Sequence, residues 1–280
     1  MGWMRLVGGI RKSWSTYVVA GIAALFTVFP VYWLVNTSVQ PPGCVYRVPP
    51  ALFPAAVSLH AYAAAIQRGT IFTWIKNSII VSVGTVLLNL FLAIPAAYSI
   101  ARFKNRFNGI VMFMILATQM ISPAVLVVPL CEIFRRLGLI NTLVGLVLAD
   151  ALLTLPIAAF VLIGFFEGLP REIEEAATID GCSKFAIFFR IALPLVRPAL
   201  FTVGILIFFD AWNEYMFAYT LVTRQELWVG TVGLASFIGQ FYIDWQGMLA
   251  HAVLFGILPM MVYLFCRRYI VRGIAEGFGK

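Results

Sequence analysis

The stretch EAATIDG at residues 175–181, followed nine residues after its glycine by IALP at residues 191–194, is a charged island in an otherwise apolar sequence. The chain of 280 residues is 62% hydrophobic and only 11% charged. That balance leaves too little polar surface for a soluble globule. The composition therefore indicates an integral membrane protein, and the island predicts a polar loop between membrane spans, where a soluble partner could act on the chain.

Working outward from this loop, six continuously apolar runs are each long enough to cross about 30 Å of hydrocarbon as a helix. They lie at residues 16–35, 78–100, 110–130, 143–166, 199–222 and 248–266. The runs lack the period-two alternation of barrel strands. We therefore expect an all-α integral membrane protein with six transmembrane helices.

Basic residues predict the orientation, because short positively charged loops tend to stay in the cytoplasm. With both termini inside, 14 of the 20 basic residues are cytoplasmic, and the other six are Arg47, Arg68, Lys76, Arg135, Arg136 and Arg224. We therefore expect one transmembrane domain over residues 1–280, with a cytoplasmic loop at 167–197 and a proline-rich extracytoplasmic loop at 40–70. The net charge of +8 then reflects topology and contact with anionic lipid, not a nucleic-acid surface.

The cytoplasmic loop has the pattern of two short helices joined by a bend. Pro170 suits the first turn of a helix, the acidic residues after it complement the positive helix end, and Gly181 supplies a stop. Four residues then share one face: Ile173, Ala176, Ala177 and Asp180. This face of mostly small residues would let another protein surface approach closely.

The second helix of the loop is expected to begin at Ser183, as a cap, and to be limited by Pro194. Phe185, Phe188 and Phe189 fall on one face at i, i+3 and i+4. An amphipathic segment lying in the headgroup layer would explain the phenylalanines but not the acidic cluster. Pattern alone leaves membrane-lying and partner-docking interpretations open.

The loop resembles the cytoplasmic signature of the membrane subunits of ATP-binding-cassette (ABC) importers: EAA, three residues, G, nine residues, I, one residue, LP. Every fixed position is matched, by Glu175, Ala176, Ala177, Gly181, Ile191, Leu193 and Pro194. The segments KNSIIVSVGT, AAYSIARFKNRF, AWNEYMFAYTLVT and RRYIVRGIAEGFGK are similar to carbohydrate-importer permeases related to the maltose permease. The departure is TSVQP at residues 37–41, where family members often carry a TSFKP-like stretch.

This resemblance implies the type I importer permease fold and a non-catalytic subunit. It implies pairing with a second, similar permease as a heterodimer, two ATP-binding subunits and an extracytoplasmic solute-binding protein. On this view the loop, including Asp180, docks into a groove of the ATPase, and Gly181 permits a close or left-handed turn. No cofactor is expected on this chain; ATP and Mg²⁺ belong to the ATPase. Carbohydrates are the favoured cargo, with polyols or glycerol-phosphate compounds as alternatives.

Polar residues inside the spans are candidates for a translocation path, because acids at membrane depth are costly and face protein or water. Asp210, Asn213 and Glu214 are expected to share a face of the fifth span, with Tyr215 beside them. An interhelical structural network is the more conservative interpretation. An ion-coupled secondary transporter, with Asp150, Asp210 and Glu214 as relay acids, is the alternative from another class. The sequence has no GxxxxGK(S/T) phosphate loop, HExxH or GxSxG motif, so we expect no enzyme.

Overall fold

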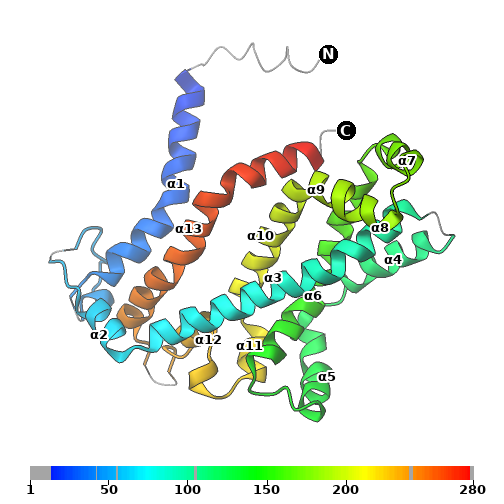
Figure 1. The fold of residues 1–280 in the computed structure, drawn as a ribbon. Helices are drawn as coiled ribbons and strands as arrows, with labels where there is room; N and C mark the ends of the chain where they lie inside the picture. The colour runs from blue at the N-terminus through cyan, green and yellow to red at the C-terminus, as the bar shows by residue number, and fades with distance from the viewer. Residues whose placement is uncertain (1–13, 42, 55, 104–105, 240–241, 278–280) are drawn as a thin grey trace. The chain divides into compact units, whose positions relative to one another are not determined.

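The computed structural model describes residues 14–41, 43–54, 56–103, 106–239 and 242–277. In these residues the chain forms helices joined by loops (Figure 1). The only β-bridge among them joins Ile238 and Ile243. The α-helices are α1 Trp14–Ser38, α2 His60–Arg68, α3 Thr70–Arg102, α4 Asn108–Thr118, α5 Pro123–Arg136, α6 Leu143–Glu167, α7 Arg171–Ile179, α8 Lys184–Ile187, α9 Leu193–Leu195, α10 Arg197–Asn213, α11 Met216–Leu221, α12 Gly230–Ala235 and α13 Trp245–Gly277. Short 3₁₀ turns lie at η3 Cys44–Tyr46 and η5 Gln225–Leu227, and η4 Phe188–Ala192 is a π-helical turn.

The chain folds as two compact units. One comprises Met1–Arg68 with Phe237–Leu254, and the other comprises Gly69–Ser236 with Phe255–Lys280. The predicted single permease domain stays a prediction.

The larger unit is built on α3, which packs along α6 and α10. Its core is rich in small side chains, which let the helix backbones approach closely in a membrane. The buried residues of this core include Ala93, Ala97, Ala101, Ala158, Ala159, Leu162, Ile163, Phe166, Ala192, Ala199 and Val203. The alanines come from α3, α6, η4 and the start of α10, so these elements form one block.

A polar seam runs between α3 and α6. Asn89 Nδ2 donates to Thr154 Oγ1 at 2.5 Å, and Thr154 Oγ1 donates to the Asp150 carbonyl at 2.7 Å. The side chain of Asp150 is buried as well. Polar pairs of this kind join helices where lipid offers no hydrogen-bond partner.

The smaller unit contains α1, α2, the proline-rich loop and the first turns of α13. The loop is fastened to the end of α1: Tyr32 OH donates to the Leu52 carbonyl at 2.5 Å, and Asn36 Nδ2 donates to the Ala51 carbonyl at 3.2 Å. Ser38 Oγ and Tyr62 OH lie 2.6 Å apart, which fixes α2 to the same end.

Four described helices are long and apolar enough to cross a membrane, or up to six if two bent pairs each count as one span. The four are residues Thr16–Ser38, Thr70–Arg102, Leu143–Glu167 and Trp245–Arg267. They confirm the predicted runs at 16–35, 78–100, 143–166 and 248–266, although α3 begins eight residues before its apolar run.

The predictions of continuous helices over 110–130 and 199–222 are wrong. The first run consists of α4 and α5, bent by 96°. Ser122 is extended, with φ −63° and ψ 132°, because the residue before Pro123 avoids the helical region. The second run is interrupted after Asn213, where Glu214 is extended with φ −64° and ψ 130°.

Candidate functional site

The signature stretch forms a helical hairpin, α7 and α8, at the C-terminal ends of α3 and α6 (Figure 1). Pro170 is the N-terminal cap of α7, one position before its first turn. Gly181 ends the first arm with φ +81°, a conformation that L side chains rarely adopt. A Cβ there would meet nothing within 4 Å. The glycine is therefore required by the backbone turn and not by lack of space.

The turn is closed by backbone hydrogen bonds typical of a helix C-terminus. Cys182 N donates to the Ala177 carbonyl at 3.0 Å, and Gly181 N donates to the Thr178 carbonyl at 3.1 Å. Ser183 Oγ accepts from Ala186 N at 3.3 Å, so the predicted cap of the second arm is confirmed.

The second arm ends one residue beyond Pro194, close to the predicted limit. Helical backbone continues from α8 through the π-helical turn η4 and α9 to Leu195. Leu193 N donates to the Phe188 carbonyl, five residues back, and this wider turn makes room for a proline that has no N–H of its own. The direction changes at Val196, where Lys184–Leu195 and Arg197–Asn213 meet at 70°.

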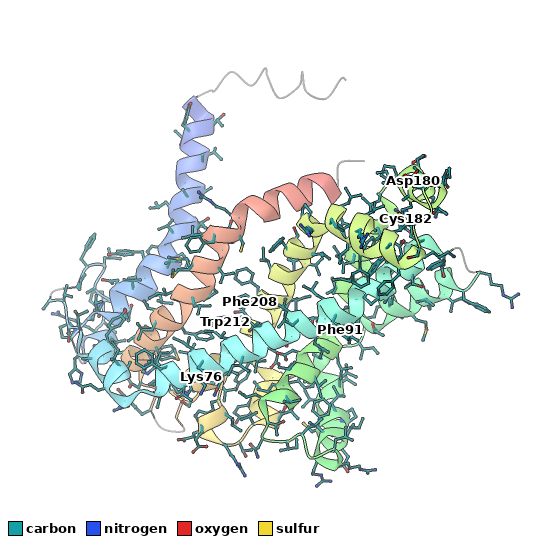
Figure 2. The ribbon with its side chains drawn as sticks, in the orientation of Figure 1. Lys76, Phe91, Asp180, Cys182, Phe208 and Trp212 are labelled. Carbon is teal, nitrogen blue, oxygen red and sulfur yellow. The ribbon has the colours of Figure 1, made fainter. Side chains whose placement is uncertain are left out.

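The predicted docking residues fall into three groups. Glu175, Ala176, Asp180 and Gly181 are exposed, and Figure 2 shows Asp180 and Cys182 at the tip of the hairpin. Ala177 is buried inside the chain. The residues of the distal part of the motif, Ile191, Leu193 and Pro194, are half-buried.

The predicted phenylalanine face is divided. Phe185 is 74% exposed and Phe189 is 48% exposed, with their ring centroids 4.5 Å apart. Phe188 turns inward and packs on Tyr98 of α3 at 4.8 Å. The hairpin therefore offers an exposed aromatic pair beside its acidic tip and keeps the third ring for its own attachment.

An ion pair joins the hairpin to α3. Arg102 Nε donates to Glu174 Oε1 at 2.7 Å, and Tyr98 OH donates to Glu174 Oε2 at 3.1 Å. Arg102 Nη2 also donates to the Leu169 carbonyl at 3.1 Å, and Arg171 Nη2 donates to the Ala101 carbonyl at 3.4 Å. Sequence reasoning missed this contact, because Glu174 in a first helical turn looks like an acid that only complements the helix dipole.

A cavity of about 200 Å³ lies between the hairpin and the end of α3. Its lining is charged and aromatic: Tyr98, Arg102, Phe103, Arg171, Glu174, Glu175, Thr178, Lys184 and Ile187. The Lys184 ammonium stands 5.3 Å from the centre of the Phe103 ring, within cation–π range.

The residues expected to line a translocation path do not share one helical face. Asp210 and Asn213 are exposed on α10, but Glu214 lies beyond its end. The Glu214 carboxylate accepts hydrogen bonds from Phe217 N at 2.7 Å and Ala218 N at 2.9 Å. Glu214 thus caps α11, and the predicted face is wrong because the helix stops one residue too early. Tyr215 is exposed and lies against the Tyr219 ring at 5.4 Å.

An aromatic stack in the larger unit escaped the sequence analysis. The Trp212 ring of α10 stacks on Phe208 at 5.6 Å, and both residues are labelled in Figure 2. It also stacks on Phe255 of α13 at 4.5 Å. Positions 208 and 212 are one turn apart, which is the signal that could have found the first pair.

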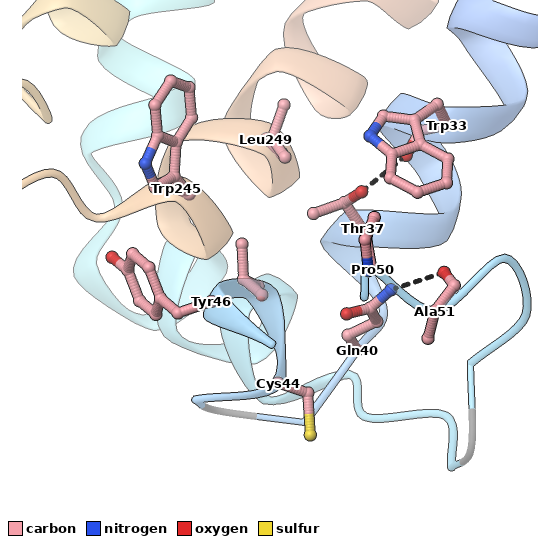
Figure 3. A pocket seen from close by; sticks show the side chains of 10 residues that line it. Trp33, Thr37, Gln40, Cys44, Tyr46, Pro50, Ala51, Trp245 and Leu249 are labelled. Atoms are coloured by element: carbon pink, nitrogen blue, oxygen red, sulfur yellow. Dashed lines mark hydrogen bonds between the residues drawn. The ribbon is translucent and has the colours of Figure 1, made fainter. Parts of the chain in front are cut away.

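The smaller unit holds a cavity of about 290 Å³ (Figure 3). Trp33 of α1, Tyr46 of the loop and Trp245 of α13 supply aromatic walls, with Gln40 among the polar residues. Tyr46 OH donates to the Ile243 carbonyl at 2.5 Å, and its hydrogen bond with Tyr242 raises the pKa of Tyr46 to about 12. Tryptophan and tyrosine at this position suit a membrane–water interface.

Metal ligands are not clustered in the part of the chain that the structure describes: no group of three or more His, Cys, Asp or Glu could hold an ion there. The apolar helices and the bent helix pairs together define a multi-pass membrane protein with a polar, exposed hairpin.

Residues 89–276 match the family described as "binding-protein-dependent transport system inner membrane component". The chain therefore belongs to this family: it is a non-catalytic permease subunit of an ABC importer, and a multi-pass inner-membrane protein. Subunits of this family work with a second permease, an ATPase and a solute-binding protein. Because the chain belongs to this family, the alternative hypothesis of an ion-coupled secondary transporter is rejected.

Three comparisons extend over nearly the whole chain. The chain is 31% identical over 263 residues to the sulfoquinovosyl glycerol transport system permease protein SmoH of Agrobacterium fabrum, covering 93% of this chain and 92% of the relative. It is 32% identical to the diacetylchitobiose uptake system permease protein DasC of Streptomyces coelicolor, covering 94% and 95%. A crystal structure of a bacterial ABC transporter involved in alginate import has a chain with TM-score 0.77 and 21% identity, covering 96% of this chain and 97% of that one. The last comparison shows the shared permease fold.

Proposed function

We propose that this permease imports carbohydrates, with disaccharides or oligosaccharides as the preferred cargo. The support comes from relatives that act on glycosides: SmoH on sulfoquinovosyl glycerol, DasC on diacetylchitobiose, and the AraQ protein of Bacillus subtilis, 29% identical, on arabinooligosaccharides. Polyols and glycerol-phosphate compounds are the second candidate cargo, because the resemblance in sequence leaves them open as alternatives.

The α7–α8 hairpin is the element that receives force from the ATPase in this proposal. The exposed turn at Gly181 carries the proposal, because a rigid, protruding hairpin can enter a groove of a soluble subunit. Glu175, Ala176, Asp180 and Gly181 would form the contact surface. Ala177, Ile191, Leu193 and Pro194 would hold the hairpin in shape, since they are wholly or partly buried.

The complete transporter would contain this chain and one homologous permease as a heterodimer, two ATP-binding subunits and one extracytoplasmic solute-binding protein. Both termini of this chain would be cytoplasmic, on the side of the hairpin. The chain itself would bind no cofactor, and ATP with Mg²⁺ would act in the ATPase subunits. Asp210, Asn213 and Tyr215 would be the candidates for the translocation path, and Glu214 would support them by capping α11.

The docking role is tested with Gly181→Val in the reconstituted complex. A branched side chain at φ +81° is strained by about 1–2 kcal/mol or more. We expect the turn to rearrange, the ATPase subunit to be lost on purification, and uptake to fall at least tenfold. Gly164→Val on α6, where a Cβ also meets nothing within 4 Å, is the control. Normal uptake by Gly181→Val would disprove the docking role.

Cargo is tested separately, by measuring ATP-dependent uptake into proteoliposomes in the presence of the cognate solute-binding protein. Labelled disaccharides, a polyol and glycerol phosphate are compared at equal concentration. We expect a disaccharide to be taken up at the highest rate. Preferential uptake of glycerol phosphate would replace the carbohydrate assignment by the second candidate without affecting the docking role.

A further inference from the structure

We propose that Arg102 is a positioning residue that fixes the coupling hairpin to α3, so that movement of the hairpin is passed to a membrane-spanning helix. The inference rests on the proposed docking role of α7 and α8. It concerns three residues outside the signature motif: Tyr98 and Arg102 near the end of α3, and Glu174 of α7. We call this group the α3–α7 joint.

In the α3–α7 joint, both oxygens of the Glu174 carboxylate accept hydrogen bonds from α3. Glu174 Oε1 accepts from Arg102 Nε at 2.7 Å, and Oε2 accepts from Tyr98 OH at 3.1 Å. Tyr98 and Arg102 are four residues apart and therefore lie on the same face of α3. Two donors on successive turns hold the carboxylate in one orientation, which a single contact would not do.

The same guanidinium reaches the chain between α6 and α7. Arg102 Nη2 donates to the Leu169 carbonyl at 3.1 Å. The planar guanidinium thus connects α3 to Glu174 and to the chain entering α7 with fixed geometry, as lysine could not. The Tyr98 ring packs on Phe188 of the second arm at 4.8 Å and on Phe166 of α6 at 5.4 Å.

The Arg102–Glu174 ion pair is more deeply buried than the other ion pairs in the described residues. The side chains of Arg102 and Glu174 are 7% and 16% exposed. The pairs that Glu132 makes with Arg135 and Arg136 involve arginines that are 73% and 78% exposed. Exposed pairs contribute little, whereas removing one partner of a buried pair leaves an uncompensated charge. The joint therefore resists separation of α7 from α3.

The contacts of α3 indicate which helices would receive a movement of the hairpin. α3 packs along both α6 and α10 through the small-residue core. A displacement of α7 would act on α3 through the joint and on α6 through Leu169. The hairpin and this helical block would then move as one body, which is what rigid-body coupling to the ATPase requires.

The test uses the full transporter, purified with its ATPase and reconstituted into proteoliposomes, and measures cargo transported per ATP hydrolysed. We expect Arg102→Gln to retain the ATPase subunit and basal ATP hydrolysis but to lower the transport-to-hydrolysis ratio about tenfold, within the usual range of allosteric coupling. Arg106→Gln is the matched control, since Arg106 is exposed just beyond α3. An unchanged ratio in Arg102→Gln would overturn the proposal.

Two further variants keep the test decisive if Arg102→Gln does not assemble. Arg102→Lys retains the charge but cannot hold both Glu174 and Leu169, so we expect assembly with a reduced ratio; a normal ratio would overturn the proposal. The exchanged pair Arg102→Glu with Glu174→Arg should recover part of the ratio lost in Glu174→Gln, a rescue that general loss of stability would not give. No recovery counts against the joint.

The outcomes distinguish the joint from the docking role. Loss of the ATPase subunit in Gly181→Val, together with a normal ratio in the Arg102 variants, would overturn the joint alone. Normal uptake by Gly181→Val would overturn the docking role on which the joint rests.

Discussion

Glu214 stabilises a short helix by accepting two of its free backbone N–H groups. Glu214→Ala would leave Phe217 N and Ala218 N without these acceptors, and we expect a loss of about 1–2 kcal/mol in the free energy of unfolding. Thermal unfolding of the purified protein in detergent checks the expectation. Glu226→Ala, at an exposed position in η5, is the control. Equal melting temperatures for both variants would contradict the capping role.

Asp150 is the most deeply buried acid of the spans, at 2% exposure, and its Oδ1 has no hydrogen-bond partner. Asp150→Asn keeps the shape and the hydrogen-bonding capacity of the side chain but cannot carry a proton. If the residue only packs between helices, we expect uptake within about threefold of normal, because interhelical polar contacts average about 0.6 kcal/mol. The measurement is the initial rate of ATP-dependent uptake, with and without a protonophore. Abolished uptake would contradict a role limited to packing between helices.

At the scale of the element, α12 approaches α3 where only glycine fits. A Cβ on Gly233 would overlap the indole ring of Trp74. We expect Gly233→Ala to destabilise the protein by about 1–3 kcal/mol through overpacking. Gly164→Ala on α6, where a Cβ is unobstructed, should instead gain up to about 1 kcal/mol in helix propensity. Parallel thermal unfolding of the two variants measures the difference, and the same sign for both would refute the packing argument.

Hydropathy located the long helices because about 20 apolar residues have few other folded states available in a membrane. It could not locate the break before α5, since the residues on both sides are equally apolar. The local signal was Ser122–Pro123, a cap followed by a proline at the first helical position. The end of α10 at Asn213 has no such signal. It depends on contacts such as Thr231 Oγ1 donating to the Glu214 carbonyl at 2.6 Å, between residues 17 apart.

In the hairpin too, features that depend on neighbouring residues could be predicted from the sequence, whereas contacts between distant residues could not. Gly181 and Ser183 could be predicted because a turn and a cap are determined by the residues that form them. The joint of Arg102 with Glu174 could not, because residues 72 apart meet only after the helices have packed. Sequence also could not show that Ala177 is buried while Ala176 beside it is exposed.

At the scale of the whole molecule, the proposed orientation places Cys182 at the cytoplasmic tip of the hairpin and Cys44 outside. Cys182 is exposed and Cys44 is half-buried in its loop. The test uses two single-cysteine variants, one that retains only Cys44 and one that retains only Cys182. We expect a membrane-impermeant maleimide to label Cys44 in intact spheroplasts and Cys182 only after permeabilisation.

The ATPase should also change this labelling. A hairpin seated in a groove buries its tip, so assembled complexes should label Cys182 at least several-fold more slowly than the permease alone, whereas Cys44 should label equally in both. Labelling of Cys182 in intact spheroplasts would reverse the orientation. It would also remove the docking surface from the compartment that holds ATP, because a hairpin outside the membrane could not touch a cytoplasmic ATPase.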